Sequence, residues 1–436
     1  MDYPAAVPYL ESFINYATGT GKDFPRHMKK LHRIRTILDR HGNPYQGLPV
    51  VLVTGTKGKG STAVMLAAIL KRAGYRVGTY LSPHLVSVRE RIRLNGRPVS
   101  KPLFARTITR LQPYLDTFAD RRAAATPSYF EILTAAAFML FRERTDLAVM
   151  EIGMGGRYDA TNMAEPLVSV ITPISLEHTQ FLGKTVTLIA GEKAGIMRTR
   201  RPVVCTARHP DALRVITRTA RALTARLLRI DRDFRVTDEK GGTVRITALG
   251  HTVGRIHIPM PGRHQSENAA AAVTAAFLLR DAGYRIAPAA IREGIARARL
   301  AGRIDLVRRS PLTVIDTAHT VDSVRALGDT IAQRWPGRPI HAVFNLSLDK
   351  DLKNIARVFP AGIRSVTIPP TGSIRNYAPR ALQARLRRAG IASVTAASVA
   401  AAIRSSSRKA GHDGIVLIFG SFFLAGKAYE YFGQAD

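Results

Sequence analysis

The sequence contains a single cysteine, Cys205, among 436 residues. One thiol cannot form an intrachain disulfide, and it excludes any metal site that is built from several cysteines. Long apolar runs are also missing, because the longest ones have the length of a strand or carry polar residues at helical spacing, so we expect no membrane span. The N-terminal stretch MDYPAAVPYLESF lacks the basic and then apolar segments of a secretory signal. Together these absences predict a soluble, cytoplasmic protein.

Acidic residues are scarce as well: 32 Asp and Glu stand against 65 Lys and Arg, which gives a net charge of +33. Such an excess attracts polyanions, including nucleic acids. The basic residues are nevertheless spread along the whole chain without a basic tail, and aromatic residues make up only 7% of it without an evident stacking motif. We therefore favour an arginine-rich, solvated surface over a nucleic-acid site, with an acidic small substrate or a weak polyanion contact as the alternatives.

Hydrophobic residues make up 46% of the chain, which is enough to bury substantial cores, and the length favours two domains. Strand-like apolar runs alternate with helical patterns through the first two thirds, which predicts a parallel sheet between helices. Residues 203–258 include a β-rich patch with a Gly-Gly turn. The alternation restarts near residues 301–303, so we predict a first domain over residues 1–300 and a second, smaller α/β domain over residues 301–436.

The stretch VVLVTGTKGKGST predicts a buried strand, a glycine- and lysine-rich turn, and then a helix that runs to Arg72. The Walker A spacing fails, because Val53 stands where the first glycine belongs and Gly60 follows Lys59. The physical logic of a phosphate cradle survives: glycines let backbone N–H groups turn toward an anion, the helix N-terminus adds its dipole, and Lys59 adds charge. The alternative is a glycine-rich turn with solvated lysines.

Polar side chains stand where three predicted strands end. Ser82 follows one strand, Glu151 ends another, and His178 follows a third. In an open α/β sheet, ligands lie beyond the carboxyl ends of the strands, so a hydroxyl, a carboxylate and an imidazole are predicted to converge beside Lys59. Taken singly, each would more simply be a turn residue or a solvated side chain.

Many short stretches, taken in order, resemble the folylpolyglutamate synthase / dihydrofolate synthase family of Mur-type ATP-dependent amide ligases. They cover nearly the whole chain and are HGNP (41–44), GTKGKGST (55–62), SPHL (82–85), RERI (89–92), EIGMGGRYDATN (151–162), EHTQFLGKT (177–185), EKAGIM (192–197), PGRHQSENAAAA (261–272), GR (302–303), DTAHT (316–320), LDKD (348–351) and GSFFLAG (420–426). The resemblance implies an α/β fold in which a P-loop-containing, parallel-sheet ATPase domain of the Mur ligase type precedes a smaller Rossmann-like α/β domain.

The resemblance also implies how ATP would be held. Asn268 would lie on the adenine side, Asp316 would meet the ribose, and Arg303 would reach the phosphates from the second domain. The phosphates themselves would be bound by the loop residues Gly55, Thr56, Lys57, Gly58, Lys59, Gly60, Ser61 and Thr62. From the sequence pattern alone, Asn268 could instead cap a helix and Asp316 could simply end a strand.

Two Mg²⁺ ions are expected by the same resemblance, and K⁺ is also compatible with it. Ser82 and Glu151 would ligate one Mg²⁺, and His178 would help to hold the second. Lys193 matches the family's carbamylated lysine, an anionic metal ligand that forms only from the neutral amine and therefore needs a lowered pKa. Without the resemblance, Lys193 would be assigned to a helix surface.

The implied activity is the ATP- and Mg²⁺-dependent addition of L-glutamate to a folate-like carboxylate through an acyl phosphate. Its catalytic residues would be Lys59, Lys193, His178, Arg303 and His319. Phe130 and Asp159 would bind the acceptor, although Phe130 fits a helix core equally well. A non-folate acceptor in a specialised pathway is the alternative. We expect a monomer whose partners are small molecules only.

Several positions depart from the family pattern. Lys57 replaces an asparagine and Glu177 an aspartate, and Thr317, Thr320 and Val321 alter the turn after Asp316. Two further departures are Tyr158 in place of leucine and Asn345 in place of glycine. Because the phosphate-loop and metal positions are intact, we expect ATP use to persist, whereas the identities of the acceptor and of the added amino acid stay open. Lys57 is either a second phosphate contact or one more surface lysine.

Overall fold

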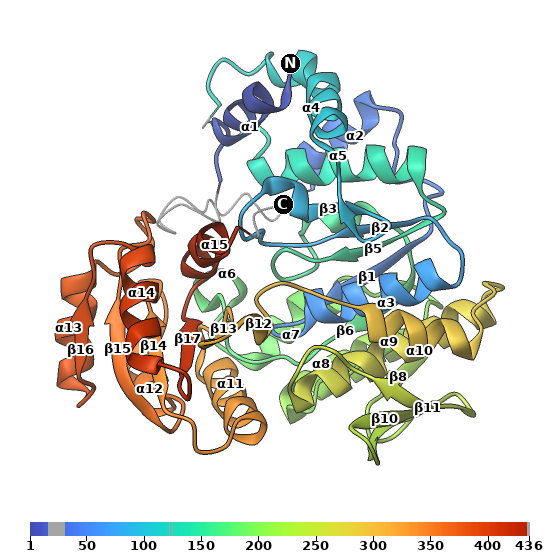
Figure 1. Ribbon diagram of the computed structural model, residues 1–436. Coiled ribbons are helices and arrows are strands. Elements are labelled where there is room, and N and C mark those ends of the chain that lie inside the picture. Colours follow the sequence, from blue (N-terminus) through green and yellow to red (C-terminus); the bar gives the residue numbers. More distant parts are fainter. Residues whose placement is uncertain (16–30, 122, 124, 434–436) are drawn as a thin grey trace. The chain divides into compact units, whose positions relative to one another are not determined.

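The computed structural model describes residues 1–15, 31–121, 123 and 125–433 (Figure 1). These residues form two compact units. The described residues within Met1–Pro83, Val88–Pro259 and Gln265–Arg299 form the N-terminal unit, and those within His84–Ser87, Met260–His264 and Leu300–Asp436 form the C-terminal unit. Each unit has its own sheet and its own hydrophobic core.

An eight-stranded sheet in the order β4-β3-β2-β5-β1-β6-β7-β8 is the centre of the N-terminal unit. The strands are β1 (Val50–Thr54), β2 (Val77–Tyr80), β3 (Ile92–Leu94), β4 (Arg97–Pro98), β5 (Leu147–Glu151), β6 (Pro166–Ile171), β7 (Val203–Cys205) and β8 (Leu227–Arg229). The neighbouring strands β2, β5, β1, β6, β7 and β8 pair in parallel, which confirms the predicted parallel sheet. Only the edge differs, because β3 pairs antiparallel with both β2 and β4. The chain reverses between β3 and β4 at Asn95 and Gly96, which have positive φ angles.

Helices cover both faces of this sheet, as Figure 1 shows. They are α1 (Tyr3–Glu11), α2 (His32–Arg40), α3 (Lys59–Arg72), α4 (Lys101–Leu115), α5 (Tyr129–Arg144), α6 (Thr179–Leu182), α7 (Val186–Ala194), α8 (Pro210–Ala222), α9 (Arg263–Asp281) and α10 (Pro288–Arg297), together with the 3₁₀ turns η2 (Val88–Arg91) and η3 (Ala160–Met163). Alternate strand residues such as Leu52 and Met150 pack with α1, α2, α4 and α5, because successive side chains of a strand point to opposite faces. Helices α3 and α10 pack against each other on the other face.

The predicted β-rich patch is confirmed as a separate antiparallel sheet in the order β11-β10-β9. Its strands are β9 (Phe234–Glu239), β10 (Thr243–Ala248) and β11 (His251–His257). Gly241 and Gly242 connect β9 to β10 with φ angles of 77° and 71°, a left-handed conformation that glycine adopts without steric cost. The sequence pattern therefore located this hairpin correctly.

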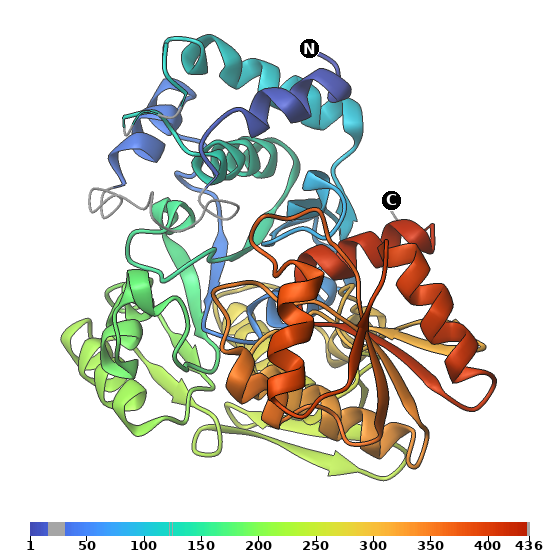
Figure 2. The ribbon, with the colours of Figure 1, turned by 90° about the vertical axis from the view of Figure 1, so that its left-hand side faces the viewer.

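The C-terminal unit contains a six-stranded sheet in the order β12-β13-β17-β14-β15-β16, which lies between helices in Figure 2. Its strands are β12 (Asp305–Arg309), β13 (Leu312–Ile315), β14 (Ile340–Phe344), β15 (Ile363–Ile368), β16 (Ser393–Thr395) and β17 (Ile415–Phe419), and its helices are α11 (Val321–Arg334), α12 (Leu352–Arg357), α13 (Pro379–Arg388), α14 (Val399–Ala410) and α15 (Phe422–Tyr431). All pairs are parallel except β12 with β13. The predicted second α/β unit is thus confirmed.

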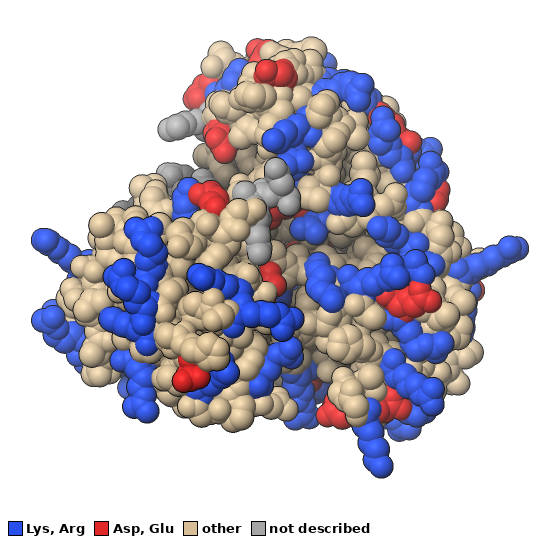
Figure 3. Space-filling model, in the orientation of Figure 1, with Lys and Arg blue, Asp and Glu red and all other residues tan. Residues whose placement is uncertain are grey.

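Two surface properties bear on function. Within the described ranges, none of the helices is both long enough and apolar enough to cross a membrane. On the face that Figure 3 shows, Lys and Arg side chains are spread over both units and do not gather in a single patch. This distribution agrees with the spread of basic residues along the sequence and with a solvated, arginine-rich surface.

Candidate active site

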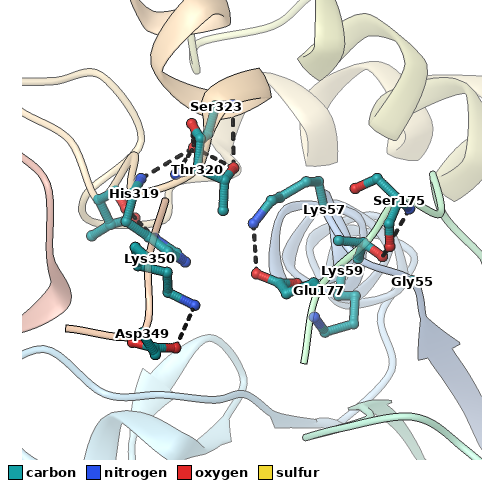
Figure 4. Close-up of polar contacts among 12 residues, drawn as sticks. Gly55, Lys57, Lys59, Ser175, Glu177, His319, Thr320, Ser323, Asp349 and Lys350 are labelled. Atoms are coloured by element: carbon teal, nitrogen blue, oxygen red, sulfur yellow. Dashed lines mark hydrogen bonds and ion pairs between the residues drawn. The ribbon is translucent and has the colours of Figure 1, made fainter. Parts of the chain in front are cut away.

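The glycine-rich turn joins the carboxyl end of β1 to the first residue of α3, which is Lys59 (Figure 4). Gly55 and Gly58 have φ angles of 149° and 84°, and no side chain caps the helix at Gly58. The first backbone N–H groups of α3 therefore have no side-chain acceptor at the cap, and the helix dipole places partial positive charge there. Strand, turn and helix follow in the predicted order and form a cradle for a phosphate group.

Close packing requires two of these glycines. A β-carbon on Gly55 would lie 1.8 Å from Thr172 Oγ1, and one on Gly58 would lie 2.3 Å from Asn268 Oδ1. Asn268 lies inside α9 and donates a 3.0 Å hydrogen bond from Nδ2 to Gln265 Oε1. The alternative of Asn268 as a helix cap is therefore wrong. Asn268 instead lies against the phosphate loop.

Glu151, the last residue of β5, lies beside the loop because β5 is the direct neighbour of β1. Its Oε2 accepts a 3.1 Å hydrogen bond from the Ser82 backbone N–H, and its Oε1 is 3.9 Å from Lys59 Nζ. The structure thus brings the Ser82 backbone, Glu151 and Lys59 together, whereas the convergence of the Ser82 hydroxyl and the His178 imidazole on this point stays a prediction.

These side chains fit a Mg²⁺ ion that is shared with a nucleotide. Mg²⁺ is usually held by one or two carboxylates and by substrate phosphates, and it needs no cage of protein ligands. Among the residues that the structure describes, no three His, Cys, Asp or Glu side chains form a metal-binding group by themselves. A buried carboxylate beside a phosphate cradle is compatible with such a shared ion.

Lys193 lies in α7 and is almost fully buried, so its assignment to a helix surface would have been wrong. Its Nζ donates a 2.7 Å hydrogen bond to the carbonyl oxygen of Gly55 in the phosphate loop. Burial, followed by the positive charge of Lys59, lowers the pKa of the Lys193 amine to about 7. A large fraction of this amine is therefore neutral near pH 7, which is the form that can react with CO₂.

The segment after β6 lies on the other side of the loop. Thr56 is hydrogen-bonded to Pro173 and Ser175, and Lys57 Nζ lies 2.8 Å from Glu177 Oε1 (Figure 4). His178 follows directly, with a left-handed φ of 52°, and precedes α6. The structure places His178 at this strand end, and its role toward a metal stays a prediction.

The two residues that are predicted to bind the acceptor substrate have clear structural contacts within the fold. The Phe130 ring packs against the core, with its centroid 5.8 Å from that of Tyr80, as the helix-core alternative requires. Asp159 is buried and accepts hydrogen bonds from the backbone N–H groups of Met154 at 3.0 Å and Thr161 at 3.1 Å, which fold the loop after β5. Contact of either residue with an acceptor stays a prediction.

In the C-terminal unit, Asp316 follows β13 and accepts hydrogen bonds from the N–H groups of Ile304 at 2.7 Å and Ala318 at 2.6 Å. Burial raises the pKa of Asp316 to about 6, although Arg303 acts in the opposite direction. His319 Nδ1 lies 2.7 Å from the Thr317 carbonyl oxygen, so this nitrogen carries the proton, because a carbonyl oxygen can only accept. The position of Asp316 at a strand end is confirmed, whereas its contact with a ribose stays a prediction.

The altered turn after Asp316 has a structural explanation. The Thr317 hydroxyl accepts a hydrogen bond from Arg303, whose guanidinium also donates to the Gly302 carbonyl at 3.0 Å. Thr320 caps α11 in a reciprocal pair with Ser323. Thr317 therefore holds Arg303, and Thr320 fixes the start of α11.

Several residues of these sites were not recognised from the sequence. Thr172 and Gln265 were not singled out, yet one contacts Gly55 and the other holds Asn268. His264 was also missed: burial, followed by the charge of Arg303, lowers its pKa to about 4, so that it is neutral at pH 7. The stretch HQSEN (264–268) is the signal that could have identified His264 and Gln265, whereas no sequence motif marks Thr172.

Comparison with known proteins identifies the family. Residues 53–276 match the Mur ligase middle domain, and residues 302–422 match the Mur ligase glutamate ligase domain. The chain is 32% identical to the folylpolyglutamate synthase of Lacticaseibacillus casei over 432 residues, which cover 98% of this chain and 97% of that protein. The chain belongs to the folylpolyglutamate synthase / dihydrofolate synthase family of Mur ligases. The predicted family resemblance is thereby confirmed.

Solved structures of folylpolyglutamate synthases agree with this assignment. A Mycobacterium tuberculosis folylpolyglutamate synthase complexed with ADP is similar to this chain with a TM-score of 0.88 and 31% identity, and the match covers 99% of both chains. The Escherichia coli FolC in complex with DHPP and ADP has a TM-score of 0.86 and 28% identity, over 99% of this chain and 98% of that one. The fold prediction is confirmed over both units.

The close approach of Gly58 to Asn268 leads to a testable prediction. Gly58→Ala is expected to weaken the binding of ADP by about tenfold or more, because the added methyl group overlaps the Asn268 side chain. Gly74→Ala is the matched control: Gly74 follows α3 with a similar φ of 96°, but nothing lies within 4 Å of its added β-carbon. Isothermal titration with ADP checks this, and equal affinities of the two variants would refute the argument.

Proposed function

We propose that this chain is an ATP- and Mg²⁺-dependent ligase that joins L-glutamate to the carboxylate of a folate-like acceptor. The observation that carries the proposal is the phosphate loop, where Lys59 faces Glu151 and the buried Lys193 holds the Gly55 carbonyl. The names of its relatives supply the substrate class, because they are folylpolyglutamate and dihydrofolate synthases.

The chemistry follows from the low reactivity of a carboxylate. The acceptor carboxylate oxygen attacks the γ-phosphorus of ATP, the bond to the bridging oxygen of ADP breaks, and an acyl phosphate forms. The neutral amine of glutamate then attacks the acyl carbon and gives a tetrahedral intermediate. Its collapse forms the amide and expels phosphate, which takes with it the oxygen that came from the acceptor, and the amine releases a proton.

The residues of the N-terminal unit supply charge and position for these steps. Lys59 and the first N–H groups of α3 would neutralise the transferred phosphoryl group, and Asn268 would bind on the adenine side. Ser82, Glu151, His178 and carbamylated Lys193 would hold two Mg²⁺ ions, which when bound withdraw charge from the phosphates. The same proposal includes the roles of Arg303, Asp316 and His319 and the presence of a K⁺ ion. It also includes the binding of the acceptor by Phe130 and Asp159.

One assay separates this function from the alternatives. ADP release is measured with dihydropteroate, tetrahydrofolate or no acceptor, each combined with a panel of amino acids. We expect release to require both glutamate and one of the two pterin acceptors. An absence of turnover with both pterins, in a protein that binds ADP, would indicate the alternative, a Mur-type ligase with a non-folate acceptor. Stimulation of ADP release by DNA alone would overturn the ligase proposal.

Four further predictions accompany this function. The chain is expected to act as a monomer in the cytoplasm, without a nucleic-acid partner, and to divide into domains between residues 300 and 301. Light scattering of the purified protein checks the oligomeric state, and a dimer mass would contradict the monomer. Gel-shift titration with DNA at physiological salt checks the absence of a nucleic-acid partner despite the net charge of +33.

A further inference from the structure

Lys57 and Glu177 form an ion pair between the phosphate loop and the segment after β6 (Figure 4). Lys57 Nζ lies 2.8 Å from Glu177 Oε1, and the two side chains are 30% and 12% exposed. Lys57 lies in the phosphate loop, and Glu177 lies directly before His178. Two residues 120 positions apart in the sequence therefore face each other in the fold.

The same two segments are joined by further hydrogen bonds. The Thr56 N–H donates to the Pro173 carbonyl at 2.8 Å. The Thr56 hydroxyl donates to the Ser175 carbonyl and accepts from the Ser175 N–H, both at 3.1 Å. The ion pair extends this row of contacts by one loop residue. Two successive residues of the loop, Thr56 and Lys57, therefore hold it against the segment after β6.

The two lysines of the loop have different carboxylate partners. Lys57 is in hydrogen-bond contact with Glu177, whereas Lys59 Nζ is 3.9 Å from Glu151 Oε1, which is beyond a hydrogen bond. Lys59 is also the first residue of α3, where the helix dipole favours an anion. A bound phosphate can thus recruit Lys59 without breaking a short ion pair, whereas recruiting Lys57 would leave the mostly buried Glu177 carboxylate without this partner.

We infer that Lys57 is a positioning residue: through Glu177 it fixes the phosphate loop to the segment that carries His178, and the phosphate contact belongs to Lys59. The inference deepens the proposed function and rests on it. Lys57 is then neither a second phosphate ligand nor an ordinary surface lysine.

A double-mutant cycle tests this inference. The variants are Lys57→Met, Glu177→Gln and the combination of the two, and both kcat/KM for ATP and the Kd for ADP with Mg²⁺ are measured. If Lys57 acts through Glu177, the single variants each lose about tenfold, and the double variant loses no more than the worse single one. Lys57→Arg, which retains the ion pair, is expected to restore activity to within about twofold of the wild type.

Lys71→Met is the matched control, since Lys71 lies in the last turn of α3 and bonds the Asn95 carbonyl at an exposed site. Losses that multiply in the double variant, or a Lys57→Arg variant as poor as Lys57→Met, would overturn the inference in favour of direct phosphate binding. Thermal melting confirms that each variant folds, and Lys57→Gln replaces Lys57→Met if the latter does not. The ADP measurement is independent of ligation, so a wild type without ligase activity would refute the proposed function and leave the cycle interpretable.

Discussion

Lys59→Ala is expected to lower the rate of glutamate-dependent ADP release by about a thousandfold, the size of effect seen when one group that stabilises a transition-state anion is removed. Lys59 is the first residue of α3 and lies 3.9 Å from Glu151, so its charge stands where the helix dipole and the phosphate loop meet. Steady-state kinetics with saturating ATP check the change in kcat, which we expect to exceed the change in KM.

The control for this variant is Lys71→Ala. Lys71 lies on the same helix, at the end remote from the loop, and contacts the exposed Asn95 carbonyl. Its removal is expected to leave kcat within about twofold of the wild type, because exposed substitutions away from special features have small effects. A Lys59→Ala variant that keeps most of the wild-type activity would refute the assignment of the loop as the site of phosphoryl transfer.

Lys193→Met is expected to abolish turnover and, at the same time, to stabilise the fold. Methionine is similar in size to lysine and apolar, so it removes the cost of burying an amine whose pKa is about 7 in the folded chain. The reactive amine beside the Gly55 carbonyl is lost with it. We expect a melting temperature a few degrees above that of the wild type, together with turnover reduced by about a thousandfold.

The pH dependence of stability tests the same residue. The Lys193 amine has a folded pKa of about 7. In the unfolded chain its pKa lies near the ordinary lysine value of about 10.4, so between pH 7 and 10 the unfolded state binds more protons. The free energy of unfolding contributed by this group therefore rises with pH, by at most about 1.4 kcal/mol per pH unit. Denaturant titrations from pH 7 to 9 are expected to show a smaller rise in Lys193→Met, and an identical pH dependence in both proteins would contradict the buried amine.

Some features of the site were predictable from the sequence because they are local. The glycines around Lys59, with a buried strand before them and a helix after them, predicted the loop. Ser82 and Glu151 were predictable as neighbours because parallel strands end at one edge of the sheet. The hairpin at Gly241 and Gly242 was predictable from its Gly-Gly pair, because both residues adopt the positive φ angles that favour glycine.

Other features depend on contacts between distant residues, which no local pattern contains. The local pattern alone would place Lys193 on a helix surface, and only the packing of α7 beside the phosphate loop buries its amine. The ion pair of Lys57 with Glu177 joins residues 120 positions apart. The antiparallel edge at β3 was missed for the same reason, since strand direction depends on pairing and not on hydrophobicity.

The most direct test of the account is an isotope-transfer experiment. The acceptor is prepared with a heavy oxygen isotope in its carboxylate and incubated with ATP, Mg²⁺, L-glutamate and the enzyme, and the inorganic phosphate is analysed by mass spectrometry. An acyl phosphate predicts that each amide formed transfers one labelled oxygen to phosphate, with one ADP released. Amide formation that leaves the phosphate unlabelled, or ADP release without any amide, would contradict the claim that this site activates a carboxylate for ligation to glutamate.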